Sequence, residues 1–188
     1  MTKIIDYNFY MVDINYIEYL NKIDSEVYFN NSYRSNIKPF VGIVVFIDEY
    51  HYFIPLSSAK EKHKNWKNVS KEHFLIYEIV EGNADINGIS KSYSNDKRLH
   101  ILSVLDIKKM IPVPEKHYKK MDFKNFKDLK YKKLLEKEYN FCLSIKDKLV
   151  DKVEEIYREQ KKTGIIRLAH CNFNKLESAM KEWENLQI

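Results

Sequence analysis

The chain has 188 residues, of which 44% are hydrophobic and 14% aromatic, so its length and composition predict one globular domain and exclude a disordered chain. Its formal net charge of +5 at pH 7 favours an anionic partner. We expect a cytoplasmic protein without a membrane role, because no apolar run approaches the roughly 20 residues of a membrane span and Asp6 interrupts any secretory signal.

The first elements are a strand and a helix. Residues 4–12 are mostly β-branched and aromatic, which is typical of a strand. Asp13 can cap a helix that runs to about Ile23, because apolar side chains recur there at helical spacing. Residues 24–38 have no clean period and form a predicted loop, whose binding groups near the next strand would be Tyr33, Arg34 and Lys38. The alternative is a solvated loop that happens to be basic.

Two strands follow as a predicted hairpin. Residues 40–47 are almost wholly apolar, residues 48–51 turn the chain back, and residues 52–56 form the second strand. That second strand stops at two adjacent hydroxyls, Ser57 and Ser58, with Lys60 two residues further on. None of these three side chains suits a core, so the strand end is the first candidate for a functional site.

The residues at this strand end suit phosphodiester chemistry. Hydroxyls and a lysine can orient a phosphate, neutralise its growing negative charge and move a proton without a metal. His63 follows shortly afterwards, and its ordinary pKa near neutrality suits a general acid or base. The alternatives are a solvated strand end, and a histidine that orients the loop or contacts RNA.

Residues 60–73 contain five lysines and only two glutamates, which predicts an exposed, cationic segment. Trp66 within it is expected to pack against the protein, as is Trp183 near the C-terminus. The lysines assigned to RNA in this segment are Lys62, Lys64 and Lys67.

The rest of the predicted sheet follows this cationic segment. Residues 74–80 and 99–105 are apolar strands, and residues 110–114 end the sheet region. The polar stretch 85–97 between the two strands is predicted to be a mobile insert.

From about residue 122 the apolar side chains recur with a helical period. Ser144 with Asp147 predicts a capping box between two helices, and Thr163–Gly164 ends the second. Asn174 with Glu177 predicts the start of a last amphipathic helix. We therefore expect one α+β domain over residues 1–188, with 1–114 mainly sheet plus one N-terminal helix and 115–188 mainly helical.

A second lysine cluster lies ahead of these helices. Residues 116–133 hold eight lysines against two aspartates, interleaved with aromatic side chains that can stack on single-stranded bases. A simpler alternative is a helix whose aromatic side chains lie in the core and whose lysines face solvent. This alternative fits Phe123 and Phe126, which are therefore expected in the core. The residues assigned to RNA are Lys116, Tyr118, Lys119 and Lys120.

Four short stretches together resemble the ToxN/AbiQ endoribonuclease family, the toxins of type III toxin–antitoxin systems. They are Lys38-Pro39-Phe40-Val41-Gly42-Ile43-Val44, Pro55-Leu56-Ser57-Ser58-Ala59-Lys60, the Leu-Asp-Ile-Lys-Lys-Met-Ile-Pro-Val run of residues 105–113, and Cys171-Asn172-Phe173. Each is weak alone, but their order and spacing along the chain are specific. The stretch 83–98 departs from the family and resembles an insertion.

The resemblance implies a metal-independent endoribonuclease that leaves a 2′,3′-cyclic phosphate and a 5′-hydroxyl. It implies that Ser57, Ser58 and Lys60 are active-site residues, with Ser58 binding the phosphate or 2′-oxygen and Lys60 stabilising charge. It also implies that Tyr33 and a nearby cation, Arg34 or Lys38, help to hold the phosphate. No cofactor or metal is expected, since Cys142 and Cys171 lie far apart without metal-ligand spacing and predict reduced thiols.

The resemblance also implies a fold and partners. The fold would be a strongly twisted antiparallel sheet of about six strands, resembling the compact barrel of Kid and MazF toxins, flanked by helices. The partners would be substrate RNA and a pseudoknotted, repeat-derived antitoxin RNA that the enzyme processes and with which it forms a closed ring. The alternatives are a non-catalytic RNA-binding module, and a toxin of the MazF or CcdB kind held by a protein antitoxin.

Overall fold

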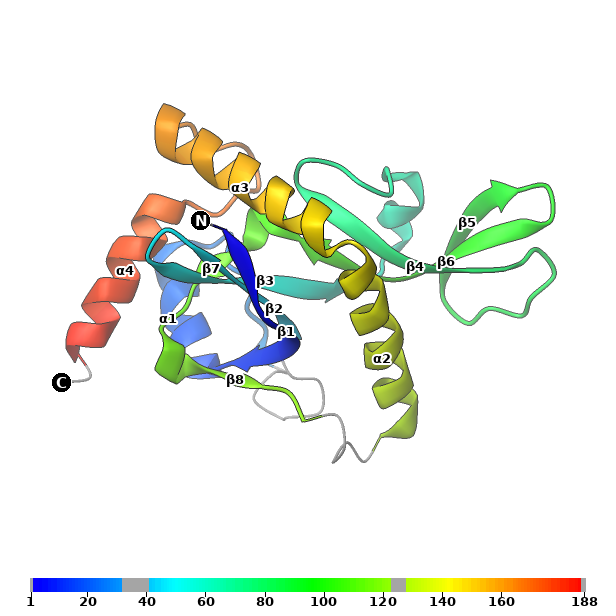
Figure 1. Cartoon of the computed structure of the whole chain (residues 1–188), viewed down its shortest axis with the longest axis horizontal. Helices are drawn as coiled ribbons and strands as arrows, with labels where there is room; N and C mark the ends of the chain where they lie inside the picture. The colour runs from blue at the N-terminus through cyan, green and yellow to red at the C-terminus, as the bar shows by residue number, and fades with distance from the viewer. Residues whose placement is uncertain (1, 32–40, 123–127, 187–188) are drawn as a thin grey trace.

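The computed structural model describes residues 2–31, 41–122 and 128–186. Within these ranges the chain is α+β, with eight strands in one antiparallel sheet and four α-helices around it (Figure 1). The strands follow the order β4-β6-β3-β2-β1-β8, while β5 pairs with β6 and β7 with β3. The expected count of about six strands was therefore too low, because short or polar strands such as β5 and β8 give no strong apolar pattern.

The N-terminal strand and helix confirm the predicted pattern. Strand β1 spans Lys3–Val12, and helix α1 spans Ile14–Ile23. The Asp13 carboxylate caps α1 by accepting a hydrogen bond of 2.8 Å from the backbone N–H of Asn15. Helix α1 buries the face that carries Tyr16, Ile17 and Leu20.

The predicted central hairpin is present as β2 (Val41–Ile47) and β3 (Tyr50–Ser58). Strand β3 is longer than expected, since both serines belong to it rather than following it. Up to Pro55 it pairs with β2, and from Leu56 to Ser58 it pairs with β6. Strand β3 therefore joins the two halves of the sheet, and its last residues lie where they meet.

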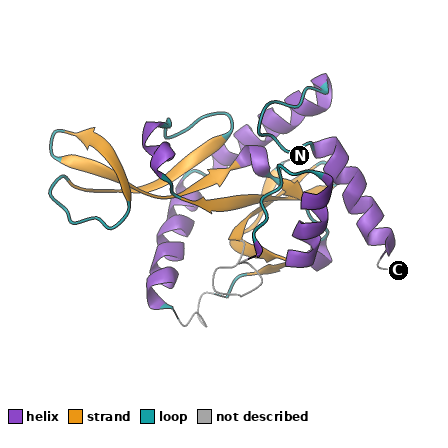
Figure 2. Cartoon of the chain, turned by 180° about the vertical axis from the view of Figure 1, so that it is seen from behind, coloured by secondary structure: helices purple, strands orange, loops and turns teal. Residues whose placement is uncertain are grey.

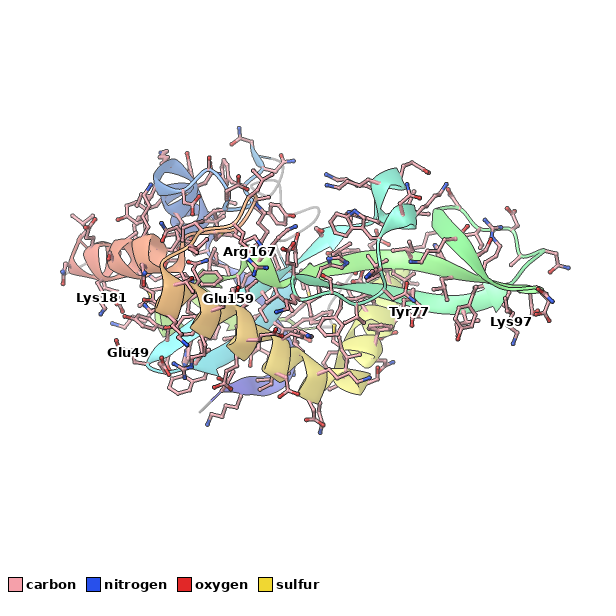
Figure 3. The ribbon with its side chains drawn as sticks, turned by 90° about the horizontal axis from the view of Figure 1, so that it is seen from above. Glu49, Tyr77, Lys97, Glu159, Arg167 and Lys181 are labelled. Atoms are coloured by element: carbon pink, nitrogen blue, oxygen red, sulfur yellow. The ribbon has the colours of Figure 1, made fainter. Side chains whose placement is uncertain are left out.

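Strands β4 (His73–Glu81), β5 (Ile89–Ser94) and β6 (Lys97–Asp106) extend as an arm from the body (Figure 1). Lys97 lies at its outer end and Tyr77 nearer the body (Figure 3). The prediction of a mobile insert over 85–97 was wrong, because β5 pairs with β6 through most of its length. Strand β5 gives no strong apolar pattern, because serine occupies every second position and the alternate positions hold one isoleucine, one lysine and one tyrosine. Strands β7 (Ile111–Pro112) and β8 (Tyr118–Lys120) complete the sheet.

The predicted helices are α2 (Leu129–Ser144), α3 (Lys146–Thr163) and α4 (Phe173–Leu186). Helix α3 ends at Gly164 in the left-handed conformation, as predicted, with φ of 67°. The capping box was wrong: the Ser144 hydroxyl donates to the Phe141 carbonyl, and Ile145, between α2 and α3, gives α3 no side-chain cap. Helix α4 also begins earlier than predicted, because Asn172 and not Asn174 accepts the hydrogen bond from the Lys175 backbone.

The helices cover a large core and place α2 beside the base of the arm (Figures 1 and 2). A smaller apolar cluster of Leu75, Ile101 and Val104 lies in the arm, and Trp66 packs on it. Trp183 packs against Tyr19, as predicted, with ring centroids 4.8 Å apart. Phe123 and Phe126 fall outside the described residues. Within the described ranges, no helix has the length and apolar character needed to cross a membrane.

Candidate active site

A pocket of about 540 Å³ opens where the end of β3 meets the arm and helix α2. Five of the predicted site residues line it: Ser57 and Ser58 from β3, Lys60 from the connection, and Lys62 and His63 from the short 3₁₀ helix η2 (Glu61–Asn65). Residues of β6 and α2 also line it. The lining includes residues from both halves of the sheet, from the segment after α1 and from α2: Tyr28, Asn30, Val41, Ser57, Ser58, Lys60, Lys62, His63, Trp66, Ser103, Tyr131, Leu134, Leu135 and Glu138.

The sheet register sets the position of both serines. Ser57 lies opposite Val104 of β6, and Ser58 lies opposite Ser103. Ser58 is exposed and Ser57 is half-buried. Paired strands fix the backbone of both residues, so both line the pocket from a rigid element, although successive side chains of a strand alternate between its faces.

Two hydrogen bonds link Lys60 and His63 across one turn. The Lys60 backbone N–H donates to His63 Nδ1 at 2.9 Å, and the His63 N–H donates to the Lys60 carbonyl at 2.8 Å. Burial, reinforced by the Lys62 and Lys60 charges, lowers the pKa of His63 to about 4. His63 is therefore neutral at pH 7, with Nδ1 accepting, which favours the alternative in which it orients the loop.

Trp66 fixes the other end of this loop. Its ring centroid lies 4.6 Å from that of His63 and 4.5 Å from that of His73. Lys62 Nζ lies 5.4 Å from the same ring centroid, within cation–π range. Trp66 therefore acts as a packing residue, as the sequence predicted, and it keeps Lys62 beside the pocket.

Helix α2 contributes a carboxyl group that sequence reasoning missed. Glu138 lines the pocket although it is only 5% exposed, and burial raises its pKa to about 7. Its neighbour across the pocket wall is Ser103 of β6, whose hydroxyl opposes this rise in pKa. The signal in the sequence was a glutamate within an apolar helical face, one turn from Leu134 and Leu135 on one side and from Cys142 on the other.

Tyr28 forms a further part of the wall and is fixed from behind. Its hydroxyl donates to Asp106 Oδ2 at 2.6 Å. Asp106 is buried, and this burial raises its pKa. The hydrogen bond therefore ties the segment that follows α1 to the end of β6.

Three predicted residues, Tyr33, Arg34 and Lys38, lie outside the described residues. The nearest pocket residues on either side along the chain are Asn30 and Val41.

Two predicted lysines lie close to the pocket in sequence but do not line it. Lys64 is exposed and forms an ion pair of 2.7 Å with Glu61, and Lys67 is exposed on the same loop. Both remain predictions for RNA contact.

The second lysine cluster is remote from the pocket. Strand β8 lies three strands away from β3, on the far side of β2 and β1. Lys116, Lys119 and Lys120 are exposed there, whereas Tyr118 is half-buried, with its hydroxyl 2.7 Å from His51 Nδ1. The structure thus separates two basic surfaces that the sequence could not place relative to each other.

Within the described residues, no three or more His, Cys, Asp or Glu side chains group together as metal ligands would. Cys142 and Cys171 are free thiols, both buried. The chemistry that the pocket offers is thus that of hydroxyls, lysines and one carboxyl group.

Comparison with known proteins decides the family. Residues 8–181 match the family model described as toxin ToxN of type III toxin–antitoxin systems. The chain belongs to this ToxN family. It is 30% identical over 185 residues to endoribonuclease ToxN of Bacillus thuringiensis subsp. kurstaki, covering 94% of this chain and 84% of that protein. It is 31% identical over 176 residues to endoribonuclease AbiQ of Lactococcus lactis, and the match covers 90% of this chain and 85% of AbiQ.

Solved ToxN-family structures agree with this assignment. One, from a bacterial antiviral system regulated by a processed non-coding RNA, has a TM-score of 0.71 at 26% identity and covers 93% of this chain and 98% of that chain. Another comes from a type III system in which a non-coding RNA pseudoknot inhibits the toxin. It has a TM-score of 0.67 at 28% identity, and the match covers 94% of this chain and 97% of that chain. The family resemblance inferred from four short stretches is confirmed.

Proposed function

We propose that this chain is an endoribonuclease and the toxin of a type III toxin–antitoxin system. The observation that carries the proposal is that Ser57, Ser58 and Lys60 enter one pocket in a chain of the ToxN family. Relatives that the chain matches over most of its length are endoribonucleases. The pocket is large enough for a nucleotide with its flanking phosphates, and cations line it.

The proposed reaction is attack of a ribose 2′-oxygen on the adjacent phosphorus, with loss of the 5′-oxygen. Ser58 hydrogen-bonds the scissile phosphate or the 2′-oxygen, because a serine is a poor base near neutral pH. Lys60 neutralises the charge that grows on the phosphate oxygens and donates a proton to the leaving 5′-oxygen. Ser57 supports the same phosphate, and Tyr33, Arg34 and Lys38 keep the phosphate-holding role that the resemblance implies.

The proposed regulator is an RNA. The matched type III structure in which a pseudoknot inhibits the toxin supports a pseudoknotted RNA antitoxin for this chain as well. We further propose that this RNA is processed by the chain and closes a ring with it. A single domain over 1–188, a cytoplasmic location and a core like the Kid and MazF barrel complete the proposal.

The experiment that tests the function is cleavage of single-stranded RNA by the purified chain with excess EDTA. We expect cleavage to continue, because no described cluster has the side chains of a metal site. The products should carry 2′,3′-cyclic phosphate and 5′-hydroxyl ends, detected by end-labelling and mass spectrometry. A 2′-deoxy substitution at the cut site is the matched control and should block cleavage there.

Loss of activity in EDTA with recovery in magnesium would contradict the mechanism. Absence of any cleavage, together with tight RNA binding, would favour the non-catalytic RNA-binding alternative. Neutralisation of the toxin by a small protein encoded upstream, instead of by a repeat RNA, would favour the alternative with a protein antitoxin.

The remote lysine cluster makes a separate prediction about antitoxin binding. Replacing Lys116, Lys119 and Lys120 together with alanine should weaken RNA binding, because Lys119 and Lys120 are exposed on the edge strand β8 and Lys116 is exposed just before it. Each lost phosphate contact should lower the magnitude of the log–log salt slope by roughly 0.7. Filter binding or fluorescence anisotropy across a salt series measures the slope. An unchanged affinity and slope would make this cluster only a solvated surface.

A further inference from the structure

The pocket contains cations and hydroxyls, but the proposed reaction also needs an acceptor for the 2′-hydroxyl proton. His63 is poorly suited, because its Nδ1 already accepts from the Lys60 backbone and the other ring nitrogen of the neutral imidazole therefore carries the proton. Serine hydroxyls are too weakly basic. Among the described residues that line the pocket, Glu138 is the one carboxyl group.

The helical spacing of α2 aims Glu138 at the pocket. Tyr131, Leu134, Leu135 and Glu138 recur at the i, i+3, i+4 and i+7 positions of one helix face, and all four line the pocket. Helix α2 packs against β4 and β6 at the base of the arm (Figure 2). The carboxyl group is therefore carried by a rigid helix.

The sheet register places a residue of β6 beside Ser58 as well. Ser103 lies directly opposite Ser58, and side chains at opposed positions share a face with Cβ atoms roughly 5 Å apart. Ser103 is 3% exposed, and its hydroxyl lies close enough to the Glu138 carboxyl group to interact with it and to oppose the rise in its pKa. Ser103 therefore links the wall that carries Glu138 to Ser58, its opposed neighbour in the sheet.

We propose that Glu138 is the general base of the reaction, a role that rests on the proposed endoribonuclease function. Its carboxylate takes the proton as the 2′-O–H bond breaks and the 2′-oxygen bonds to phosphorus. The P–O5′ bond breaks in the same reaction, and the 5′-oxygen receives a proton from Lys60. Ser103 positions the carboxylate and the 2′-hydroxyl relative to Ser58.

The surroundings of Glu138 suit this role. Burial raises its pKa to about 7, which places a base where it is most effective near neutral pH. The group that interacts with it is the Ser103 hydroxyl on β6, and Cys142, one turn along α2, is close enough for the Glu138 charge to act on it. Tyr131, Lys60 and Lys62 line the same pocket. Burial, and next the Glu138 charge, raise the pKa of the Cys142 thiol above its ordinary value, so this thiol does not compete as a base.

The test is Glu138→Gln in a single-turnover cleavage assay on a labelled single-stranded RNA that the unaltered chain cuts. We expect the rate at pH 7.5 to fall by about 10²- to 10⁴-fold, with RNA affinity nearly unchanged. The unaltered chain should gain rate with rising pH through about 7, as the carboxylate forms, and Glu138→Gln should lose this step. The matched control is Glu136→Gln, an exposed carboxyl group on the same helix, which should keep rate and pH profile.

The outcomes separate the two proposals. An unaltered chain that cuts no RNA overturns the endoribonuclease function, whereas a Glu138→Gln chain that cuts with unchanged rate and pH profile overturns only the base. A change of cut sites without loss of rate also overturns the base and makes Glu138 a base-recognition residue. If Glu138→Gln does not fold, the unaltered chain still decides: a flat pH–rate profile between pH 6 and 8 overturns the proposal.

Discussion

Replacing Lys60 with alanine should lower the rate of RNA cleavage by at least about 10²- to 10³-fold, the usual effect of removing one group that stabilises transition-state charge. Lys60 is exposed and lines the pocket, and its backbone is held by His63. RNA affinity should change little, because only one phosphate contact among several is lost. That loss should lower the magnitude of the log–log slope of affinity against salt by roughly 0.7. Single-turnover cleavage and equilibrium binding of the same RNA measure the two effects.

The matched control for Lys60 is Lys64→Ala, four residues along the same loop. Lys64 does not line the pocket and pairs with Glu61, so we expect near-normal cleavage. In cells without antitoxin, Lys60→Ala should relieve growth arrest while Lys64→Ala should not. An equal loss of cleavage rate in both variants would show that the rate depends on the total positive charge of the loop. It would contradict the specific role assigned to Lys60.

Ser58→Ala should lose cleavage in the same assay while the protein stays folded. Ser58 is exposed at the end of β3, where a substitution usually changes stability by no more than about 0.5 kcal/mol. Its thermal unfolding should therefore match that of the unaltered chain, and full toxicity of a well-expressed Ser58→Ala protein would exclude the role assigned to this hydroxyl.

The sequence predicted those parts of the fold in which burial leaves a regular pattern. The β2–β3 hairpin was identified because both strands are buried along most of their length and give continuous apolar runs. Helix α1 was identified because one of its faces is buried and Asp13 caps it. Strand β5 was missed because its serines and lysine are held by pairing with β6, and pairing between distant strands leaves no periodic apolar signal.

The site was predictable only where its residues are neighbours along the chain. Ser57, Ser58 and Lys60 stood together at one strand end, so their type and spacing pointed to phosphate chemistry. Glu138 is some eighty residues away, and the pocket exists only because α2 packs against the arm. His63 looked like an acid or base, but its pKa depends on a burial that composition does not reveal.

Glu177 shows the same limit within the core. The sequence suggested a helix-start position for it, whereas the structure places it nearly fully buried within α4. Its Oε1 accepts hydrogen bonds from Tyr52 of β3 at 2.8 Å and from Tyr157 of α3 at 2.9 Å. Lys161 Nζ lies 2.6 Å from Oε2. One carboxylate thus ties α3 and α4 to the strand that carries both site serines.

Glu177→Ala should lower the free energy of unfolding by about 3–5 kcal/mol, because it leaves two buried phenols and a lysine without their shared acceptor. Urea unfolding measures this. Glu182→Ala on the exposed face of α4 is the matched control and should change stability by no more than about 0.5 kcal/mol.

Removing the two tyrosine hydroxyls that donate to Glu177 should recover part of the lost free energy of unfolding. With Tyr52→Phe and Tyr157→Phe added to Glu177→Ala, neither of these two positions keeps a buried hydroxyl without an acceptor, so the triple variant should be more stable than Glu177→Ala alone. Because β3 carries Ser57 and Ser58, Glu177→Ala should also lose cleavage at lower urea than the unaltered chain does. A Glu177→Ala protein within about 1 kcal/mol of the unaltered chain would show that these hydrogen bonds contribute little to holding β3 against the helices.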